Sequence, residues 1–268
     1  MASTDSLPAD FKARAARAIT RQPILRDPRL HEAYLRSRRA RRRRQRRRLE
    51  ARGDESRSWP ALHGMDRRLA ELLGDRAGFF VEAGANDGYD QSNTYALARL
   101  RGWRGLLVEP IPALYEETVL TRPESEVRNV ALVRHGHPEE TVTMRHGGLM
   151  SVVAGARGSE EDDRAWVAEA FRLGLEHEYT VEVPARTLDD LLVEIGDPAV
   201  DLLSLDVEGY ETEVLRGLDL ERRGPAFMLV EVRDPAAGKP PIDALVGDLY
   251  DEVEMLSPFD VLYRRRGD

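Results

Sequence analysis

Short apolar runs alternate with segments of helical periodicity over most of the chain. The apolar runs are typical of buried parallel strands. We predict five such strands, at 78–83, 105–109, 127–132, 200–206 and 226–231. Helical segments are predicted beside them, at 69–73, 92–100, 188–195 and 211–218. This alternation predicts βαβ units and therefore an α/β fold with a mainly parallel sheet.

Two regions depart from this alternation. Near the end of the chain, 252–256 and 260–265 flank Ser257-Pro258-Phe259, which predicts an antiparallel hairpin that closes the sheet. The stretch 134–179 is rich in histidine, glycine and acids, with a helical piece around 165–173. It is too long for a standard connection, and such insertions are usually functional lids or disordered segments. It therefore has two interpretations, a cover over the substrate or a mobile surface loop.

The composition is that of a soluble protein with a substantial core and a heavily charged surface, since 41% of the residues are apolar and 33% are charged. No apolar run approaches the roughly 18 to 20 residues of a membrane span, and no secretory signal is recognisable at the N-terminus. The absence of cysteine excludes disulfides, thiolate metal sites and cysteine nucleophiles. We expect a cytoplasmic protein that does not bind a membrane.

Charge divides the chain into two parts. Residues 1–58 carry 18 lysines and arginines against 7 acids, so their net charge is +11, and the other residues must carry −19. Nine of the eleven residues in 38–48 are arginine, in a stretch without proline or glycine that is compatible with a helix. Gly53-Asp54-Glu55-Ser56 then breaks the pattern. We predict a basic helical extension at 1–58 and one α/β domain at 59–268.

Candidate site residues follow the strands, because open parallel sheets bind ligands at the carboxyl ends of their strands. Gly84 and Gly88 allow a tight turn after the first strand, and Glu109 ends the second, where a carboxylate can accept hydrogen bonds from a ribose diol. The turn lacks the middle glycine of the dinucleotide fingerprint, which favours a ligand without phosphates. S-adenosylmethionine is such a ligand, and its ammonium favours a carboxylate such as Glu82 or Asp206.

Several blocks of sequence, in this order and spacing, resemble the FkbM family of methyltransferases. They are 81–88, 92–94, 102–110, 128–132, 187–190 and 206–211. The resemblance covers roughly residues 78–263. It implies a Rossmann-like class I methyltransferase fold, S-adenosylmethionine as the donor, and O-methylation of a hydroxyl on a sugar or a secondary metabolite.

The resemblance also assigns the cofactor contacts. It places contacts to the methionine part of the donor in the loop after the first strand (Glu82, Gly84, Ala85, Asn86 and Gly88) and a contact to the ribose at the end of the second strand (Glu109). It places contacts to the adenine beyond the second and third strands (Pro110, Ile111, Asn129 and Val130). Asp206, after the fourth strand, would contact the amino-acid part of the donor or the acceptor. The acceptor is not implied, because residues 1–58 and 134–179 lie outside the strong match.

Three residues are candidates for catalysis. Asp206 and Glu208 lie at one strand end beside a glycine, and we predict that one of them orients or deprotonates the acceptor hydroxyl. The alternative for Glu208 is a cap on the following helix. His146 is a candidate base because histidine titrates near neutrality, although a loop histidine is more often just solvated. Asp206, Glu208 and Glu231 could offer oxygen ligands to Mg²⁺, but no ligand spacing is diagnostic and we predict no metal.

The arginine run has three interpretations: a solvated tail, a site for RNA or another polyanion, and an arm that docks on an acidic face of its own domain or of a second subunit. We favour docking over nucleic-acid binding, because the run lacks interleaved aromatic residues and the catalytic domain is acidic. The expected partners are thus a small hydroxylated acceptor and, through the arm, a second copy of the chain. The alternatives are a nucleic-acid-directed methyltransferase or RNA-binding protein and, less favoured, an NAD(P)-dependent oxidoreductase.

Overall fold

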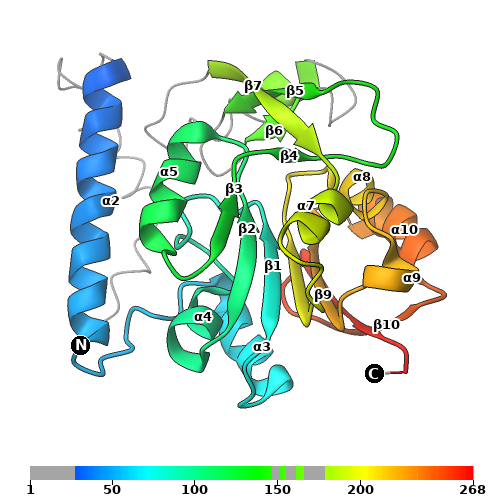
Figure 1. Ribbon diagram of the computed structural model, residues 1–268, viewed down its shortest axis with the longest axis horizontal. Coiled ribbons are helices and arrows are strands. Elements are labelled where there is room, and N and C mark those ends of the chain that lie inside the picture. Colours follow the sequence, from blue (N-terminus) through cyan, green and yellow to red (C-terminus); the bar gives the residue numbers. More distant parts are fainter. Residues whose placement is uncertain (1–27, 147–150, 155–160, 166–178, 234, 268) are drawn as a thin grey trace.

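A seven-stranded sheet forms the centre of the computed structural model (Figure 1). Its strands are β1 (Phe79–Ala83), β2 (Arg104–Val108), β3 (Glu126–Arg128), β8 (Leu202–Leu205), β9 (Phe227–Glu231), β10 (Tyr250–Met255) and β11 (Asp260–Arg265). They lie in the order β10-β11-β9-β8-β1-β2-β3. Strands β1, β2, β3, β8 and β9 pair in parallel, and β11 pairs antiparallel with β9 and β10. The predicted parallel sheet with a C-terminal antiparallel hairpin is confirmed.

The structure describes residues 28–146, 151–154, 161–165, 179–233 and 235–267. The helices named in these residues are α2 (Pro28–Glu50), α3 (Met65–Leu73), α4 (Tyr95–Arg101), α5 (Pro112–Thr121), α7 (Leu188–Glu194), α8 (Glu211–Leu215), α9 (Leu220–Arg223) and α10 (Pro235–Val246). None of the helices in the described ranges has the length and apolar character needed to span a membrane. The helical piece predicted around 165–173 lies outside these ranges except for Ala165, which belongs to a helical stretch at 161–165.

The sheet is buried on both faces, which explains why its strands are continuous apolar runs rather than alternating ones. Neighbouring residues of β1 point to opposite sides. Val81 belongs to the core that α7, α8, α9 and α10 cover, and Phe80 belongs to the core that α3 and α4 cover. The central strands are therefore held in register by packing from both sides.

Two predicted elements differ from the structure, and the helices α5 and α10 were not predicted. The helix predicted at 92–100 begins only at Tyr95, because Ser92, Asn93 and Thr94 hydrogen-bond to the carboxylate of Glu82. The strand predicted at 127–132 is two strands, of which only β3 joins the central sheet. Helix α10 was not predicted at all, since it contains Pro240 and Pro241, which normally mark the end of a helix.

A second, four-stranded sheet contains the strands that the structure describes in the atypical stretch 134–179. It consists of β4 (Ala131–Leu132), β5 (Thr141–His146), β6 (Val152–Val153) and β7 (Tyr179–Arg186), in the order β4-β7-β5-β6. Apolar side chains of this small sheet pack against Ile111 and Leu114 at the start of α5. Figure 1 shows the small sheet lying across the end of the central sheet toward which β1 and β2 point. The insertion therefore covers the edge where the site residues lie.

The basic extension forms helix α2, which lies alongside α5 (Figure 1). Arg43 forms an ion pair of 2.7 Å with Glu117, and Arg47 donates a hydrogen bond of 2.8 Å to the carbonyl oxygen of Leu120. Arg46 is almost fully buried and donates to the hydroxyl of Tyr95 on α4. Of the interpretations of the arginine run, these contacts support docking on the chain's own domain.

Gly105 on β2 faces Phe80 on β1, and a Cβ atom at Gly105 would lie 2.4 Å from the Phe80 ring. We expect Gly105→Ala to lower the free energy of unfolding by about 1–3 kcal/mol, because overpacking strains a well-packed core. Chemical denaturation measures this change. Combining Gly105→Ala with Phe80→Leu should recover part of the loss, and a double variant in which the two losses simply add would contradict the clash.

Candidate active site

The candidate site lies where the chain leaves β1 and β8, the neighbouring strands at which the strand order reverses. Gly84 follows β1 with a φ of 86°, and a Cβ atom there would lie 1.8 Å from the backbone carbonyl oxygen of Asp206. The Asp206 amide in turn donates to the Ala83 carbonyl at 3.1 Å. The close approach expected at Gly84 is therefore to the end of β8, and it brings the glycine turn and Asp206 together.

Glu109 joins the glycine turn to the end of β2. Its two carboxylate oxygens accept hydrogen bonds from the amides of Asn86 (2.7 Å) and Ile111 (2.8 Å). Asn86 has a φ of 50°, and its carbonyl oxygen accepts a hydrogen bond from Thr118 of α5. Burial raises the pKa of Glu109 to about 8, although both amide hydrogen bonds lower it. A buried carboxyl at this strand end can still accept further hydrogen bonds, as a ribose diol would require.

The predicted adenine-side residues divide into two groups. Asn129 donates from its side-chain amide to the carbonyl oxygens of Glu109 and Pro110, both at 2.8 Å, so it fixes the path of the chain after β2. Ile111 is fully buried among the apolar side chains of α5 and the small sheet. Val130 is buried in the core against α7 and α8. Asn129 and Pro110 are thus the partly exposed members of this predicted set.

The carboxylate of Glu82 is engaged in hydrogen bonds and an ion pair with other residues of the chain. It accepts hydrogen bonds from the Ser92 hydroxyl (3.0 Å), the Thr94 hydroxyl (2.6 Å) and the Asn93 amide (3.0 Å). It also pairs with the guanidinium of Arg122 at 3.4 Å, and the Arg122 side chain is 0% exposed. Glu82 therefore binds the segment that follows the glycine turn, and holds that segment against β1.

Arg122 is a site residue that the sequence did not reveal. Besides Glu82, its guanidinium contacts the Thr94 hydroxyl at 3.1 Å and lies over the rings of Phe80 and Tyr95. These partners are distant in sequence, and Arg122 belongs to no recognisable motif. Only the tertiary structure brings them around the arginine.

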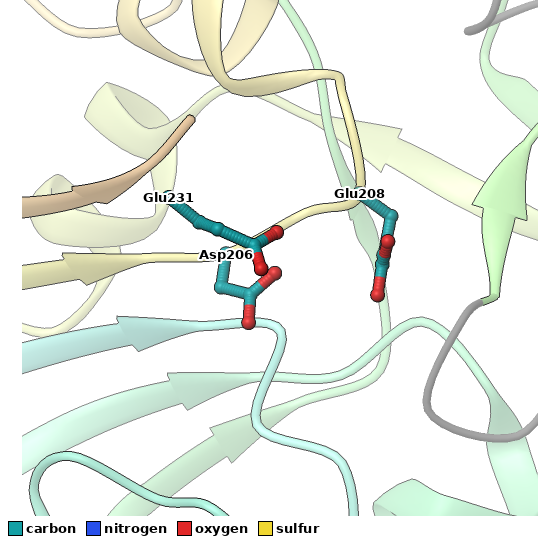
Figure 2. A group of neighbouring side chains, drawn as sticks. All are labelled: Asp206, Glu208 and Glu231. Atoms are coloured by element: carbon teal, nitrogen blue, oxygen red, sulfur yellow. The ribbon is translucent and has the colours of Figure 1, made fainter. Parts of the chain in front are cut away.

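Three carboxylates meet at the ends of β8 and β9. Figure 2 shows the side chains of Asp206 and Glu231 pointing toward each other, with Glu208 directed to the same region from the turn after β8. One oxygen from each of the three lies within 4.8 Å of the others. Burial, and then the neighbouring Glu231 and Glu208, raise the pKa of Asp206 well above its usual range. This clustering of acids favours a positively charged ligand.

Arg233, just after β9, partly neutralises the negative charge of the three acids. Its guanidinium lies 3.0 Å from Glu208 and 3.0 Å from Glu231. Glu208 has a φ of 59°, and in that turn it is Glu211 that accepts the hydrogen bonds from the amides of Val207 and Gly209. The two interpretations of Glu208, as a residue that acts on the acceptor and as a cap on α8, both stay predictions. Asp206 has no ion pair with Arg233, and its buried Oδ1 atom has no hydrogen-bond partner in the described part of the chain.

The carboxylates also bear on the metal prediction. Oxygen atoms of this kind are ligands that Mg²⁺ accepts, and Asp206, Glu208 and Glu231 lie close enough together to share one ion. That grouping alone does not identify a metal site, because Arg233 already pairs with two of the three acids. The prediction that no metal is needed stays a prediction, and activity in excess chelator would test it.

His146 ends β5 in the small sheet. Its Nδ1 atom lies 3.1 Å from the Ser151 hydroxyl, and its ring lies 4.6 Å from the Tyr179 ring between centroids. His135, elsewhere in the insertion, pairs with Asp189 at 3.0 Å. His146 is buried and held within the small sheet rather than solvated, and its proposed role as a base stays a prediction.

Comparison with known proteins places this site in a family. The family described as Methyltransferase FkbM domain matches residues 82–264. Among solved structures, the chain is similar to the methyltransferase FkbM from Methylobacillus flagellatus KT (16% identity, TM-score 0.41), covering 70% of this chain and 43% of that chain. It thus spans less than half of that protein's length. No curated protein matches the chain.

Two further solved structures are similar over most of this chain. One is a TehB-like SAM-dependent methyltransferase from Corynebacterium glutamicum ATCC 13032 Kitasato (12% identity, TM-score 0.38, 86% of this chain and 99% of that chain). The other is an O-methyltransferase family protein from Burkholderia thailandensis (14% identity, TM-score 0.38, 90% of this chain and 72% of that chain). The family match and the strand order confirm the predicted Rossmann-like class I methyltransferase fold.

The buried pair of Glu82 and Arg122 predicts a stability change. Arg122→Met should lower the free energy of unfolding by about 3–5 kcal/mol, because it leaves the buried carboxylate without its cation. The matched control is Arg128→Met, which removes a more exposed pair with Glu126 and should change stability by at most about 1 kcal/mol. Chemical denaturation of both variants measures the difference. Equal losses would contradict the importance of the buried pair.

Proposed function

The chain belongs to the FkbM methyltransferase domain family, and from this premise we propose that it transfers a methyl group to a hydroxyl of a sugar or a secondary metabolite. The observation that carries the proposal is the meeting of four strand ends: the glycine turn after β1, Glu109 after β2, and the acids after β8 and β9. The first two suit the adenosyl part of the donor, and the acids suit its positive charges and an acceptor whose proton must be removed.

The donor of this reaction is S-adenosylmethionine, and the described residues fit it. The turn at Gly84–Gly88 carries positive φ at Gly84, Asn86 and Gly88, and its two glycines have no Cβ atom that would hinder the approach of a ligand to the backbone. Glu109 presents a buried carboxyl for the ribose hydroxyls. The unpartnered Oδ1 atom of Asp206 and the excess of acids beside it suit the positive charges of the ammonium and the sulfonium. Because Glu82 is engaged with Arg122, Asp206 suits the ammonium better than Glu82 does.

When bound, S-adenosylmethionine supplies a methyl group that its sulfonium already activates. What remains for the protein is to align the acceptor and to remove its hydroxyl proton as the carbon–oxygen bond forms and the carbon–sulfur bond breaks. Asp206 and Glu208 are the residues that we assign to this task. The raised pKa of Asp206 makes its carboxylate a stronger base than an exposed aspartate. Arg233 holds Glu208 in place through their ion pair.

The small sheet completes the acceptor side. Its strands lie across the carboxyl ends of the central strands (Figure 1), and its apolar core is continuous with Ile111 and Leu114. Tyr210, in the turn before α8, also packs against that core. A small acceptor would therefore lie between the small sheet and the three acids. We assign acceptor selection to this sheet, because the family blocks are concentrated elsewhere in the chain.

Two measurements test the proposal. Calorimetry with S-adenosylhomocysteine, NAD and a generic RNA distinguishes a methyltransferase from an oxidoreductase and from an RNA-binding protein. A screen of hydroxylated metabolites and sugars with labelled donor then identifies the acceptor. Binding of S-adenosylhomocysteine alone, followed by transfer of label to a hydroxyl, is the expected result. Transfer of label only to RNA would overturn the assignment of a small acceptor.

Neutralising the acids should affect turnover more than donor binding. We expect Asp206→Asn and Glu208→Gln each to lower kcat by about 10²–10⁴-fold, the usual contribution of a general base. The Kd for S-adenosylhomocysteine should change little in Glu208→Gln. In Asp206→Asn, which also loses the proposed contact to the ammonium, the Kd should rise by a smaller factor than kcat falls. Glu221→Gln, at an exposed position of α9, is the control. Full turnover in both Asp206→Asn and Glu208→Gln would exclude these residues as the base.

The raised pKa of Glu109 predicts a pH dependence of ribose binding. Below about pH 8 the carboxyl is mostly protonated, and above it the ionised group accepts stronger hydrogen bonds from the ribose hydroxyls. Binding of 5′-methylthioadenosine, which has the ribose but no amino acid, should therefore tighten by about 5- to 10-fold between pH 6.5 and pH 9. Calorimetry at several pH values measures this. The same pH dependence in Glu109→Gln would assign it to another group.

A further inference from the structure

We propose that helix α2 clamps the donor-binding turn from outside, with Arg46 as the positioning residue. The inference rests on the proposed donor site. Helix α2 lies outside the residues that the family matches, and its arginines contact α4 and α5, the two helices that flank the glycine turn. The clamp would set how rigidly the turn is held before the donor binds.

The first contact is made by Arg46 itself. Its side chain is buried, with a residue exposure of only 4%, although it lies within a run of solvated arginines. The guanidinium lies 3.5 Å from the centroid of the Tyr89 ring, close enough for a strong cation–π interaction. Tyr89 is the residue immediately after Gly88. Arg46 thus covers the end of the donor-binding turn without entering the site.

Tyr89 and Asp90 are held by the extension at further points. The Tyr89 hydroxyl donates to the backbone carbonyl of Arg57 at 2.9 Å, and Arg42 lies 3.8 Å from the Asp90 carboxylate. Burial and the neighbouring Asp87 raise the pKa of Asp90, while nearby arginines of α2 lower it. Asp87 itself accepts hydrogen bonds from the amides of Tyr89 and Asp90. The donor-binding turn therefore begins at the end of β1, and the two residues that follow it, Tyr89 and Asp90, lie against the extension.

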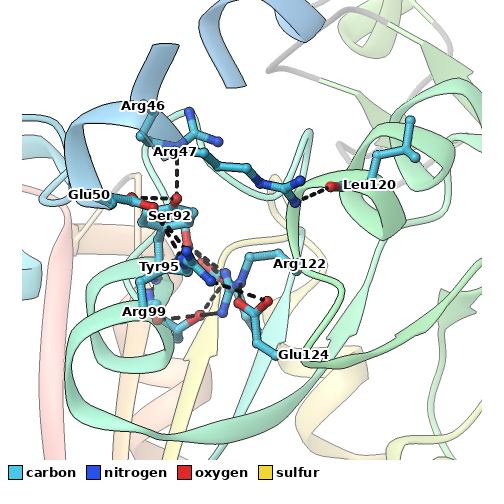
Figure 3. Close-up of polar contacts among 11 residues, drawn as sticks. Arg46, Arg47, Glu50, Ser92, Tyr95, Arg99, Leu120, Arg122 and Glu124 are labelled. Atoms are coloured by element: carbon cyan, nitrogen blue, oxygen red, sulfur yellow. Dashed lines mark hydrogen bonds and ion pairs between the residues drawn. The ribbon is translucent and has the colours of Figure 1, made fainter. Parts of the chain in front are cut away.

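A second line of contacts leads from α2 to β1 (Figure 3). Arg46 donates to the Tyr95 hydroxyl at 2.8 Å, and this hydroxyl donates to Glu50 at 2.8 Å. The Tyr95 amide donates to the Ser92 hydroxyl, which in turn donates to Glu82. The helix is thereby connected to the buried carboxylate at the base of the glycine turn.

The third contact is with α5, on the other side of the turn. Arg43 pairs with Glu117, and Arg47 donates to the Leu120 carbonyl. The residue next to Glu117 is Thr118, whose hydroxyl donates to the Asn86 carbonyl in the middle of the turn. Helix α2 therefore contacts both α4 and α5. Thr118 of α5 binds the middle of the donor-binding turn, and Tyr95 of α4 packs edge-on against Tyr89, just beyond the end of the turn.

Arg46→Ala tests the clamp. A turn that is less ordered before binding must be ordered by the donor, so binding weakens. We expect the Kd for S-adenosylhomocysteine to rise by about 10-fold, which is equivalent to about 1.4 kcal/mol. Activity at saturating donor should stay near the wild-type kcat, because Arg46 is not among the acids that act on the acceptor. A loss of kcat with an unchanged Kd would overturn the proposal.

The matched control is Arg44→Ala, which removes the same charge from an exposed position of the same helix. It should leave the Kd unchanged, and an equal weakening in both variants would show a general charge effect and overturn the clamp. Arg46→Lys keeps the charge but loses the planar group above Tyr89, so an intermediate Kd is expected. Should Arg46→Ala fail to fold, Tyr89→Leu removes the same cation–π contact by replacing the ring. The Kd of this variant for S-adenosylhomocysteine then tests the clamp.

Hydrogen–deuterium exchange of the ligand-free protein separates this inference from the proposed function. Amides of residues 84–90 should exchange faster in Arg46→Ala than in wild type or Arg44→Ala. A wild-type protein that does not bind S-adenosylhomocysteine would overturn the donor site and leave the exchange result to decide the clamp. Unchanged exchange in Arg46→Ala, with wild-type donor binding intact, would overturn the clamp alone.

Discussion

The buried ion pair between Glu82 and Arg122 is the interaction on which the site depends. Removing two charged groups from water is costly, and the cost is offset only when hydrogen bonds satisfy both partners. Here the hydroxyls of Ser92 and Thr94 bind both charged groups, although the Nε atom of Arg122 has no hydrogen-bond partner among the described residues. The segment that carries these hydroxyls is consequently fixed against β1. The Asn93 side chain extends the same segment to Ser204 of β8. One pair of charges thus ties together the two strands at which the site opens.

The sequence revealed the central sheet and the position of the site because both depend on local signals. A strand buried on two faces is a continuous apolar run, and site residues of a parallel sheet must follow such runs. The roles of Arg122 and Arg233 depend instead on partners distant in sequence, Glu82 in one case and Glu208 in the other. The small sheet was missed for a similar reason, since its strands pack on residues of α5.

The same long-range packing changed the role of one predicted site residue. Glu82 or Asp206 was expected to meet the donor's ammonium, and the oxygens of Glu82 accept hydrogen bonds from Ser92, Asn93 and Thr94. Asp206 retains a buried oxygen without a partner in the described residues, in a region where Glu208 and Glu231 add negative charge. An acid that the fold leaves incompletely satisfied is more available to a cationic ligand than one that it fully satisfies. The sequence contains both acids, and the structure shows that they differ in how far the fold satisfies them.

The charge division along the chain has a structural consequence of the same kind. An arginine-rich helix beside an acidic domain gains from long-range attraction, but attraction alone would leave its orientation undefined, since exposed ion pairs contribute little. Arg46 differs because it is buried between two tyrosine rings and a hydroxyl that only one orientation of α2 can supply. Net charge therefore brings the extension to its domain, whereas a single buried guanidinium determines where the helix lies, and that position is beside the glycine turn to which we assign donor binding.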